Sequence, residues 1–156
     1  MKKIHLLIVS IVVSQLAGII GSVFTVNSID SWYRFINKPF FNPPGWIFGP
    51  VWILLYTLMG IALYFVWREG SEAKGVNKAV FVFLVHLVFN ALWSVIFFGW
   101  HMIGFALIDI LLIWVMILYL IKLFVPISKK AAYLLVPYLL WVSFAVILNL
   151  AIFVIN

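Results

Sequence analysis

Aromatic and polar side chains recur inside stretches of this sequence that are otherwise apolar. Those that could do chemistry are Trp52, Tyr56, Asn90, Trp93, Asp109, Trp141 and Asn149. Indole and phenol rings offer faces for a hydrophobic ligand, and a few polar groups can orient it. Hydrolysis and phosphoryl transfer are disfavoured, because the sequence has no Gly-rich phosphate loop, no Ser/His/Asp set and no plausible carboxylate pair.

Metal and thiol chemistry is also disfavoured. The sequence has no cysteine, which excludes disulfides, thiolate-bound zinc, iron-sulfur clusters and c-type haem attachment. Its histidines are His5, His86 and His101, and none pairs with a second ligand at metal spacing. We therefore expect no metal site and no resident cofactor.

The composition indicates that these residues are positioned by membrane-spanning helices. Of the 156 residues, 67% are hydrophobic and only 9% are charged, too few charges for a water-soluble domain. A helix that crosses a bilayer needs roughly 20 residues, so the chain has room for about five. The apolar runs are too long for the strands of a transmembrane barrel. We predict an all-α integral membrane protein, a single domain 1–156 with spans near 4–26, 46–67, 78–99, 102–124 and 131–153.

The basic residues predict the orientation of the chain. Eight of the ten fall on one side of the predicted spans, namely Lys2, Lys3, Arg68, Lys74, Lys78, Lys122, Lys129 and Lys130. Only Arg34 and Lys38 fall on the other side. The positive-inside rule then places the N-terminus in the cytoplasm and the C-terminus outside. Since these charges lie between apolar runs and not in a clustered patch, we expect no nucleic-acid partner.

The N-terminal apolar run and the first long connection each contain residues that predict their structure. The run after Lys3 is too long for the core of a signal peptide and no A-x-A site follows, so we interpret it as an uncleaved span. Its small pairs, Ala17/Gly21 and Gly18/Ser22, predict a packing seam. Loop 27–45 should form a structured lid, with a short helix that Asp30 caps and Pro39 ends.

Depth along the spans predicts that the chemically interesting residues meet. With a rise of about 1.5 Å per residue, they fall roughly 6 to 18 Å below the outer face. Trp52 and Tyr56 share one helix face, and Trp141, Ala145 and Asn149 share another. The simplest arrangement is an aromatic-walled cavity beneath the lid.

Several of these residues also have ordinary structural readings. Asn90 and Asn149 could hydrogen-bond between helices instead of touching a ligand. Asp109 could be an interhelical acceptor, a ligand-site group or a proton carrier. Pro137 should kink the last span beneath Trp141.

Four segments resemble the signature of the tryptophan-rich sensory protein family, also called translocator protein or peripheral benzodiazepine receptor. The first comprises Trp32-Tyr33, the run Lys38-Pro39-Phe40-Phe41-Asn42-Pro43-Pro44-Gly45-Trp46-Ile47-Phe48-Gly49-Pro50-Val51-Trp52, and Leu55-Tyr56. The others are Asn90-Ala91-Leu92-Trp93-Ser94, Leu107-Ile108-Asp109, and Pro137-Tyr138-Leu139-Leu140-Trp141 with Leu148-Asn149. They run in order through all the predicted spans.

The resemblance implies a five-helix bundle, usually a homodimer, that binds porphyrins and isoquinoline carboxamide or benzodiazepine-type ligands. Bacterial relatives are linked to light- and oxygen-dependent breakdown of protoporphyrin IX and to stress responses. By the family pattern, ligand would touch Trp32, Tyr33, Trp52, Asn90, Trp141 and Ala145, and Trp52 and Trp141 would take part in the breakdown. We count Pro44, Tyr56, Trp93 and Asp109 with this ligand-binding set. The porphyrin would be a ligand or substrate, not a cofactor.

Two further expectations concern charge and sterol. The propionates of a porphyrin need cations, and Arg34 and Lys38 are the basic side chains on the lid side, so we expect one or both to pair with them. The end of the last span lacks the tyrosine and basic residue of the animal cholesterol motif. We therefore expect no sterol role, and the eight-to-two bias of the basic residues fits a bacterial plasma membrane. A small transporter of porphyrin or other hydrophobic ligands and a regulatory partner protein remain as alternatives.

Overall fold

A computed structural model describes residues 2–156 as a bundle of long helices. The helices are α1 (Lys3–Ile29), α2 (Gly45–Trp67), α3 (Val76–Ser94), α4 (Ile103–Phe124), α5 (Lys129–Leu134) and α6 (Val136–Ile155), and a π-helical segment, Val95–Gly99, continues α3. Among the described residues, five helical segments are long and apolar enough to cross a membrane, with α5 and α6 forming one of them. No β-strand occurs in residues 2–156. The predicted all-helical membrane fold is confirmed.

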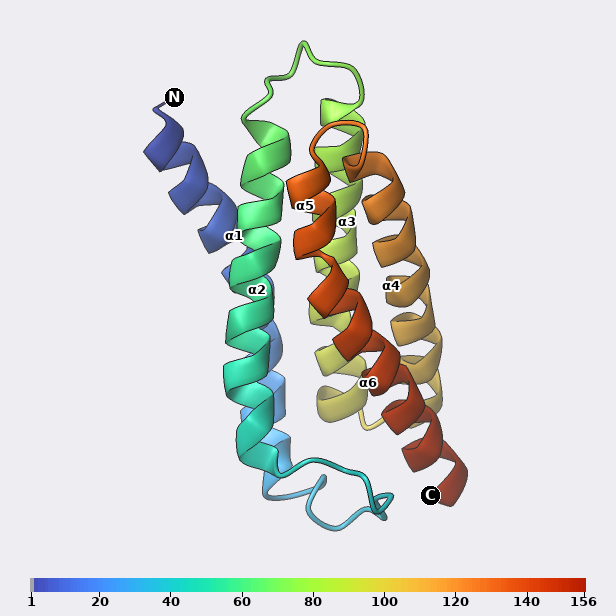
Figure 1. Ribbon diagram of the computed structural model, residues 1–156. Helices are drawn as coiled ribbons and strands as arrows, with labels where there is room; N and C mark the ends of the chain where they lie inside the picture. The colour runs from blue at the N-terminus through green and yellow to red at the C-terminus, as the bar shows by residue number, and fades with distance from the viewer. Residues whose placement is uncertain (1) are drawn as a thin grey trace.

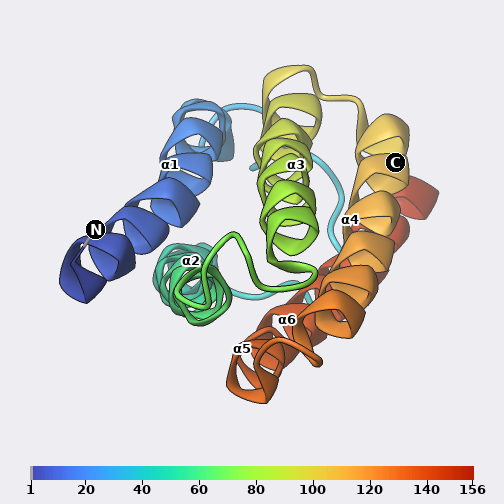
Figure 2. The same cartoon turned by 90° about the horizontal axis from the view of Figure 1, so that it is seen from above.

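The helices form a closed ring when viewed along the bundle (Figure 2). Around this ring, α1 packs on α2 and α3, α3 packs on α4, α4 packs on α6, and α2 closes the ring against α5 and α6. Neighbours in the ring are therefore not always neighbours in the chain. This order lets side chains from α1, α2, α3, α4 and α6 face one common interior.

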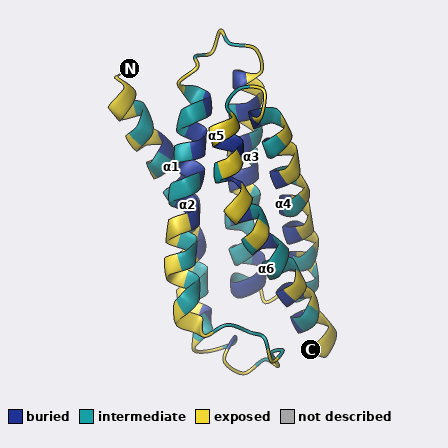
Figure 3. Cartoon of the chain, in the orientation of Figure 1, coloured by how far each residue is buried: buried dark blue, intermediate teal, exposed yellow. Residues whose placement is uncertain are grey.

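The two ends of the bundle are filled differently. Towards the end that carries the N-terminus, side chains such as Met59, Leu63, Phe83, Ile117 and Phe124 are completely buried. Figure 3 shows the contrast along α2, which is largely buried in that half and more exposed in the half that leads to the first connection. Close packing fills the centre of the first half, and the more exposed second half leaves room for a central cavity.

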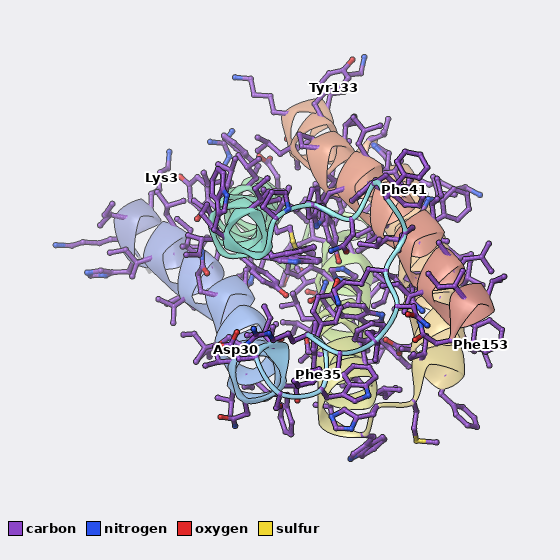
Figure 4. All side chains as sticks on the ribbon, turned by 90° about the horizontal axis from the view of Figure 1, so that it is seen from below. Lys3, Asp30, Phe35, Phe41, Tyr133 and Phe153 are labelled. Atoms are coloured by element: carbon purple, nitrogen blue, oxygen red, sulfur yellow. The ribbon has the colours of Figure 1, made fainter. Side chains whose placement is uncertain are left out.

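The lid, residues 30–44 in the structure, covers the open end of the bundle. Seen from that end (Figure 4), the chain runs from Asp30 past Phe35 and across the helix ends to Phe41. The ring of Phe41 lies 6.3 Å from that of Phe144 on α6. The lid is thus anchored by side-chain packing on the far side of the bundle.

The prediction of a short helix within the lid is wrong. Residues 30–36 form turns, and Asp30 ends α1 instead of starting a new helix. The backbone N–H of Tyr33 donates to the carbonyl of Ser28 at 2.9 Å, which turns the chain back over the bundle. Phe35, within these turns, is 79% exposed and does not pack on the bundle.

The last span is interrupted next to Pro137. Helix α5 ends at Leu134 and α6 begins at Val136, so the proline stands in the first turn of α6, where its missing N–H needs no partner. The interruption at Leu135 lies six residues before Trp141, close to where the kink was expected. It sets the direction in which α6 carries its aromatic side chains towards the lid.

The basic residues gather at one end of the molecule, as the sequence indicated. In Figure 1 the N-terminus, the α2–α3 connection and the α4–α5 connection lie at one end, and the lid and the C-terminus lie at the other. The remaining two of the ten basic residues, Arg34 and Lys38, lie in the lid at the other end. The asymmetry of charge is therefore a property of the folded molecule.

Candidate ligand-binding site

A cavity of about 450 Å³ lies between the helices in the half of the bundle next to the lid. Every membrane-spanning segment contributes to its wall. The lining residues used below are Gly18, Gly21, Ser22 and Thr25 of α1, Tyr33 of the lid, Phe48, Trp52 and Tyr56 of α2, Asn90, Trp93 and Phe97 of the third span, Ile110 of α4, and Trp141, Ala145 and Asn149 of α6. Its size falls within the roughly 300–1,000 Å³ of typical small-molecule sites.

Most of the residues predicted from the sequence line this cavity. They are Tyr33, Trp52, Tyr56, Asn90, Trp93, Trp141 and Ala145. Trp32, Pro44, Asp109, Arg34 and Lys38 do not line it. Trp32 instead packs within the lid end, stacked on His101 with ring centroids 4.3 Å apart, and Pro44 precedes the first turn of α2.

Trp52 lies at the centre of the aromatic wall. Its ring stacks on that of Tyr56, one helical turn further along α2, at 5.5 Å. It also meets Trp141 of α6 edge to face, with centroids 6.5 Å apart and planes at 89°. The two helix faces read from the sequence therefore meet, and their indoles form adjacent, perpendicular surfaces.

Helix α1 supplies the small residues of the wall. A Cβ added at Gly18 would lie 2.6 Å from the ring of Tyr56, and one added at Gly21 would lie 2.9 Å from Oγ of Ser94. The absence of side chains at these two positions lets the ring and the hydroxyl approach the α1 backbone. The pattern of small residues predicted a seam, but nothing in it showed that the seam borders a cavity.

A buried hydrogen-bonded chain extends from the cavity wall into the filled half of the bundle. The hydroxyl of Tyr56 donates to Oδ1 of Asn90, and Nδ2 of Asn90 donates to the hydroxyl of Tyr138 at 2.6 Å. The same hydroxyl lies 2.6 Å from Nε2 of His86, whose Nδ1 lies 3.2 Å from the carbonyl oxygen of Phe83. The sequence offered no signal for this chain, because His86 appeared isolated in its span.

Asn149 also connects helices. Its Oδ1 accepts from Nε1 of Trp93 at 3.0 Å, and its Nδ2 donates to the carbonyl of Ile103 at 3.2 Å. Both asparagines in the spans therefore make interhelical hydrogen bonds while they border the cavity. Of the two readings considered for them, the interhelical one describes the contacts that the structure shows.

Two buried polar atoms near the cavity are without a hydrogen-bond partner among the described residues. They are Oδ2 of Asp109 and Nε1 of Trp141. Asp109 is 6% exposed and neighbours the cavity-lining Ile110 in sequence. Because no donor reaches this oxygen, the reading of Asp109 as an interhelical acceptor loses support. A buried carboxyl oxygen without a partner is costly in a bilayer.

The two lid cations differ in what they already bind. Nζ of Lys38 donates to the carbonyls of Tyr33, Arg34 and Ile36 at 2.8, 3.2 and 3.0 Å. An ammonium has three protons, so its donors are all used within the lid. The side chain of Arg34 is exposed and makes no hydrogen bond or ion pair with the residues that the structure describes. Its guanidinium is therefore the free cation of the two.

The cavity reaches the outer surface of the bundle between α1 and α2. Ile19, Val26 and Ile53 all line it, yet they are 58, 70 and 62% exposed. In a membrane this surface faces acyl chains. The cavity is therefore open on this side and not wholly enclosed.

The fold and the cavity together define a class, a five-span helical membrane protein with an aromatic-walled cavity under a lid. Residues 10–155 match the model of the TspO/MBR family, and the chain belongs to that family. It is 41% identical to the tryptophan-rich protein TspO of Archaeoglobus fulgidus, over 96% of each chain. It is 36% identical to the human translocator protein over 86% of this chain and 80% of that one. With the tryptophan-rich sensory protein of Cereibacter sphaeroides it shares 35% identity over 77% of this chain and 73% of that one.

Proposed function

We propose that this protein is a membrane receptor that binds a porphyrin, protoporphyrin IX or a close relative, and promotes its light- and oxygen-dependent breakdown. Isoquinoline carboxamide and benzodiazepine-type ligands would occupy the same cavity. The observation that carries the proposal is the pair of perpendicular indoles, Trp52 and Trp141, on one cavity wall. A flat aromatic macrocycle can stack on one indole while it meets the other edge-on.

The shape and surroundings of the cavity suit such a ligand. Its wall is largely apolar, and its polar groups, including Ser22, Thr25 and Asn90, are uncharged. The opening between α1 and α2 allows part of a macrocycle to remain against lipid. The same cavity is large enough to enclose a drug-sized aromatic ligand completely.

The propionates of the porphyrin would point towards the lid, where water and cations are available. Arg34 is the partner that the contacts favour, because the ammonium of Lys38 is already bound by three carbonyl oxygens. A guanidinium can bind a carboxylate through two parallel hydrogen bonds. The proposal therefore assigns carboxylate pairing to Arg34 and a structural role in the lid to Lys38.

The breakdown would be photochemistry in a shaped cavity and not acid-base catalysis. A porphyrin excited by light can accept one electron from an adjacent indole, which leaves a porphyrin radical anion and an indole radical cation. Dioxygen is the second reactant. The protein's contribution is to hold the macrocycle against Trp52 and Trp141 while the reaction proceeds.

Tryptophan fluorescence and bleaching test the proposal. Adding protoporphyrin IX to the protein in lipid nanodiscs should quench intrinsic tryptophan fluorescence saturably, and illumination in air should then bleach the porphyrin. Trp52→Phe and Trp141→Phe should retain binding and bleach several-fold more slowly. Nε1 of Trp141 has no partner to lose, so the second variant removes no hydrogen bond.

Trp67→Phe, at the opposite end of α2, is the matched control and should bleach like wild type. Equal bleaching rates in all of these proteins would reject the breakdown, and the protein would then be a receptor only. Absence of saturable quenching would reject porphyrin binding itself.

A small transporter is the second candidate function, and the unpartnered carboxyl oxygen of Asp109 is the observation that favours it. An ionisable group buried in a bundle can couple proton binding to a conformational change. Uptake of porphyrin into sealed vesicles that contain the protein, abolished in Asp109→Asn, would support transport. Uptake equal to that of protein-free vesicles would exclude it.

A further inference from the structure

Tyr138 and His86 form a polar pair directly behind the aromatic wall of the cavity. Both side chains are 0% exposed, and neither lines the cavity. A histidine inside a membrane span is costly unless its two ring nitrogens are satisfied. Here the carbonyl of Phe83 and the hydroxyl of Tyr138 satisfy them, so the hydrogen bonds determine which atom carries each proton.

The carbonyl of Phe83 fixes the direction of the whole chain of hydrogen bonds. A carbonyl only accepts, so the proton on neutral His86 is on Nδ1, and Nε2 is left as an acceptor. The hydroxyl of Tyr138 must therefore donate to Nε2, and its oxygen accepts from Nδ2 of Asn90. This also fixes the orientation of the Asn90 amide, since its Oδ1 is left to accept from Tyr56.

Two tyrosines contact Trp52, but only one of them has a base to receive its proton. Tyr56 is nearer, at 5.5 Å between centroids, yet it donates to an amide oxygen, which is a very weak base. Tyr138 lies 6.5 Å from Trp52 and donates to an imidazole nitrogen. Phenol oxidation in an apolar interior requires that the phenolic proton leave, and imidazole is the side chain suited to take it.

We propose that Tyr138 and His86 are a proton-coupled electron relay that reduces the oxidised indole of Trp52. This inference rests on the proposed photochemistry, in which the photoexcited porphyrin is the oxidant. The porphyrin takes one electron from Trp52 and becomes a radical anion. Tyr138 returns one electron to the indole radical cation, and its phenolic proton moves to Nε2 of His86. The net products are a tyrosyl radical, an imidazolium and the porphyrin radical anion, and Trp52 is restored.

The relay moves a positive charge but creates none inside the bilayer. The radical cation on Trp52 is already a buried charge, and the relay transfers that charge to the imidazolium of His86. The imidazolium would be stabilised by its hydrogen bond to the carbonyl of Phe83. Because the oxidised site is then one residue further from the cavity, charge recombination slows, and the porphyrin radical anion has longer to meet dioxygen.

The first test uses the protein without porphyrin, so that it does not depend on the proposed ligand. Protein in nanodiscs carries 3-fluorotyrosine at position 138, which retains the hydroxyl and its hydrogen bonds. A laser flash absorbed by indole and not by phenol photoionises tryptophan, and electron paramagnetic resonance detects radicals after freezing. A tyrosyl radical with fluorine hyperfine splitting is expected. The same label at the exposed Tyr133 is the matched control and should give no such signal.

His86→Gln separates proton transfer from mere positioning. The glutamine can accept the hydrogen bond from Tyr138 through its amide oxygen, but it cannot take the proton. The fluorine-split radical should fall several-fold in His86→Gln and in Trp52→Phe. A labelled radical that is absent in the wild-type background, or equally strong in His86→Gln, would overturn the relay.

The second test adds protoporphyrin IX and follows the porphyrin radical anion by transient absorption. Tyr138→Phe should shorten its lifetime several-fold relative to wild type and to Tyr133→Phe, and exchange into D2O should slow tyrosyl formation only where His86 is present. An unchanged lifetime in Tyr138→Phe would overturn the relay. If porphyrin neither binds nor bleaches while the labelled radical forms in the first test, the proposed function fails and the electron relay stands.

Discussion

Single residues connect the lid to the cavity, and Tyr33 is the clearest case. It is 7% exposed, lines the cavity and donates its hydroxyl to Oδ1 of Asn42 at 2.8 Å. Nζ of Lys38 lies 4.9 Å from the centre of its ring. Substitution of Tyr33 should therefore alter both the hydrogen bonding of the lid and the wall of the cavity.

Burial raises the pKa of the Tyr33 phenol from its ordinary value of 10.0 to about 12, and the hydrogen bond to Asn42 offsets part of the rise. Between about pH 10 and pH 12 the folded protein therefore keeps the phenolic proton of Tyr33, whereas the unfolded chain releases it. Its contribution to stability is fully present below about pH 10 and is lost as the pH rises towards 12. Phenolate absorbance, measured as the difference between wild type and Tyr33→Phe, should titrate near pH 12. A difference titration centred on pH 10 would contradict this.

Gly18 should be intolerant of even one added carbon. Gly18→Ala places a methyl carbon 2.6 Å from the ring of Tyr56, which is held in place by its hydrogen bond to Asn90. We expect a loss of about 1 to 3 kcal/mol from overpacking and weaker ligand binding. Thermal unfolding in nanodiscs and fluorescence titration measure the two effects.

Gly49→Ala is the control for this substitution. Gly49 also lines the cavity from a helix, but an added Cβ there has no neighbour within 4 Å. That variant should be neutral or stabilised by up to about 1 kcal/mol through helix propensity. Equal stability of the two variants would show that the close approach of Tyr56 to α1 is not required.

At the scale of elements, the lid is an irregular segment held by its own hydrogen bonds. Lys38 bonds to carbonyls within the lid. The lid is also connected to the end of α6, because Nδ2 of Asn156 donates to the backbone carbonyl of Asn37 at 2.8 Å. Tyr33 and Asn42 link its two halves. These contacts explain how a segment without helix or strand can cover the cavity.

The two lid cations should respond differently to neutralisation. Lys38→Met keeps the alkyl stem but leaves three carbonyls without their donor, so hydrogen exchange in the lid and ligand dissociation should both accelerate several-fold. Arg34→Gln should leave lid exchange unchanged, weaken protoporphyrin IX binding and reduce its dependence on salt. Unchanged binding and salt dependence in Arg34→Gln would show that this residue does not pair with the propionates.

The spans could be predicted from the sequence because a bilayer imposes one requirement, a long apolar run, that hydropathy measures directly. The break at Pro137 could be predicted because proline lacks a backbone donor. The lid could not. Asp30 resembles a helix cap in isolation, but the structure uses it to end α1, and packing against Phe97 and His101 places Trp32.

The cavity was predictable only in part, for a related physical reason. The stripes of α2 and α6 follow from helix periodicity, which places Trp52 with Tyr56 and Trp141 with Ala145. The contribution of α1 depends on which face of that helix turns inwards, and small residues do not specify that. The pairing of His86 with Tyr138 joins positions 52 residues apart, and a lone histidine and a lone tyrosine carry no mark of it.

At the scale of the whole molecule, the bundle divides into a packed half and a half that holds the cavity. The packed half contains fully buried residues from α2, α3 and α4, among them Leu63, Phe83 and Phe124. Small side chains and bulky rings around the cavity leave the other half hollow. The packed core and the candidate ligand site thus lie at opposite ends of one structure, and the hydrogen-bonded chain from Tyr56 to His86 crosses the boundary between them.

The charge asymmetry of the two ends predicts how the molecule lies in the membrane. Eight of its ten basic residues lie at the end that carries the N-terminus, so that end should face the cytoplasm of a bacterial cell, with the lid outside. Because the sequence has no cysteine, single cysteines can report the orientation without background. Ser31 in the lid and Ser71 in the α2–α3 connection are both exposed and suit Ser→Cys substitution. A membrane-impermeant thiol reagent should label Ser31→Cys on intact spheroplasts and Ser71→Cys only after permeabilisation. The reverse pattern would place the cavity and its lid on the cytoplasmic side, where the photochemistry proposed for it would meet a different supply of porphyrin and dioxygen.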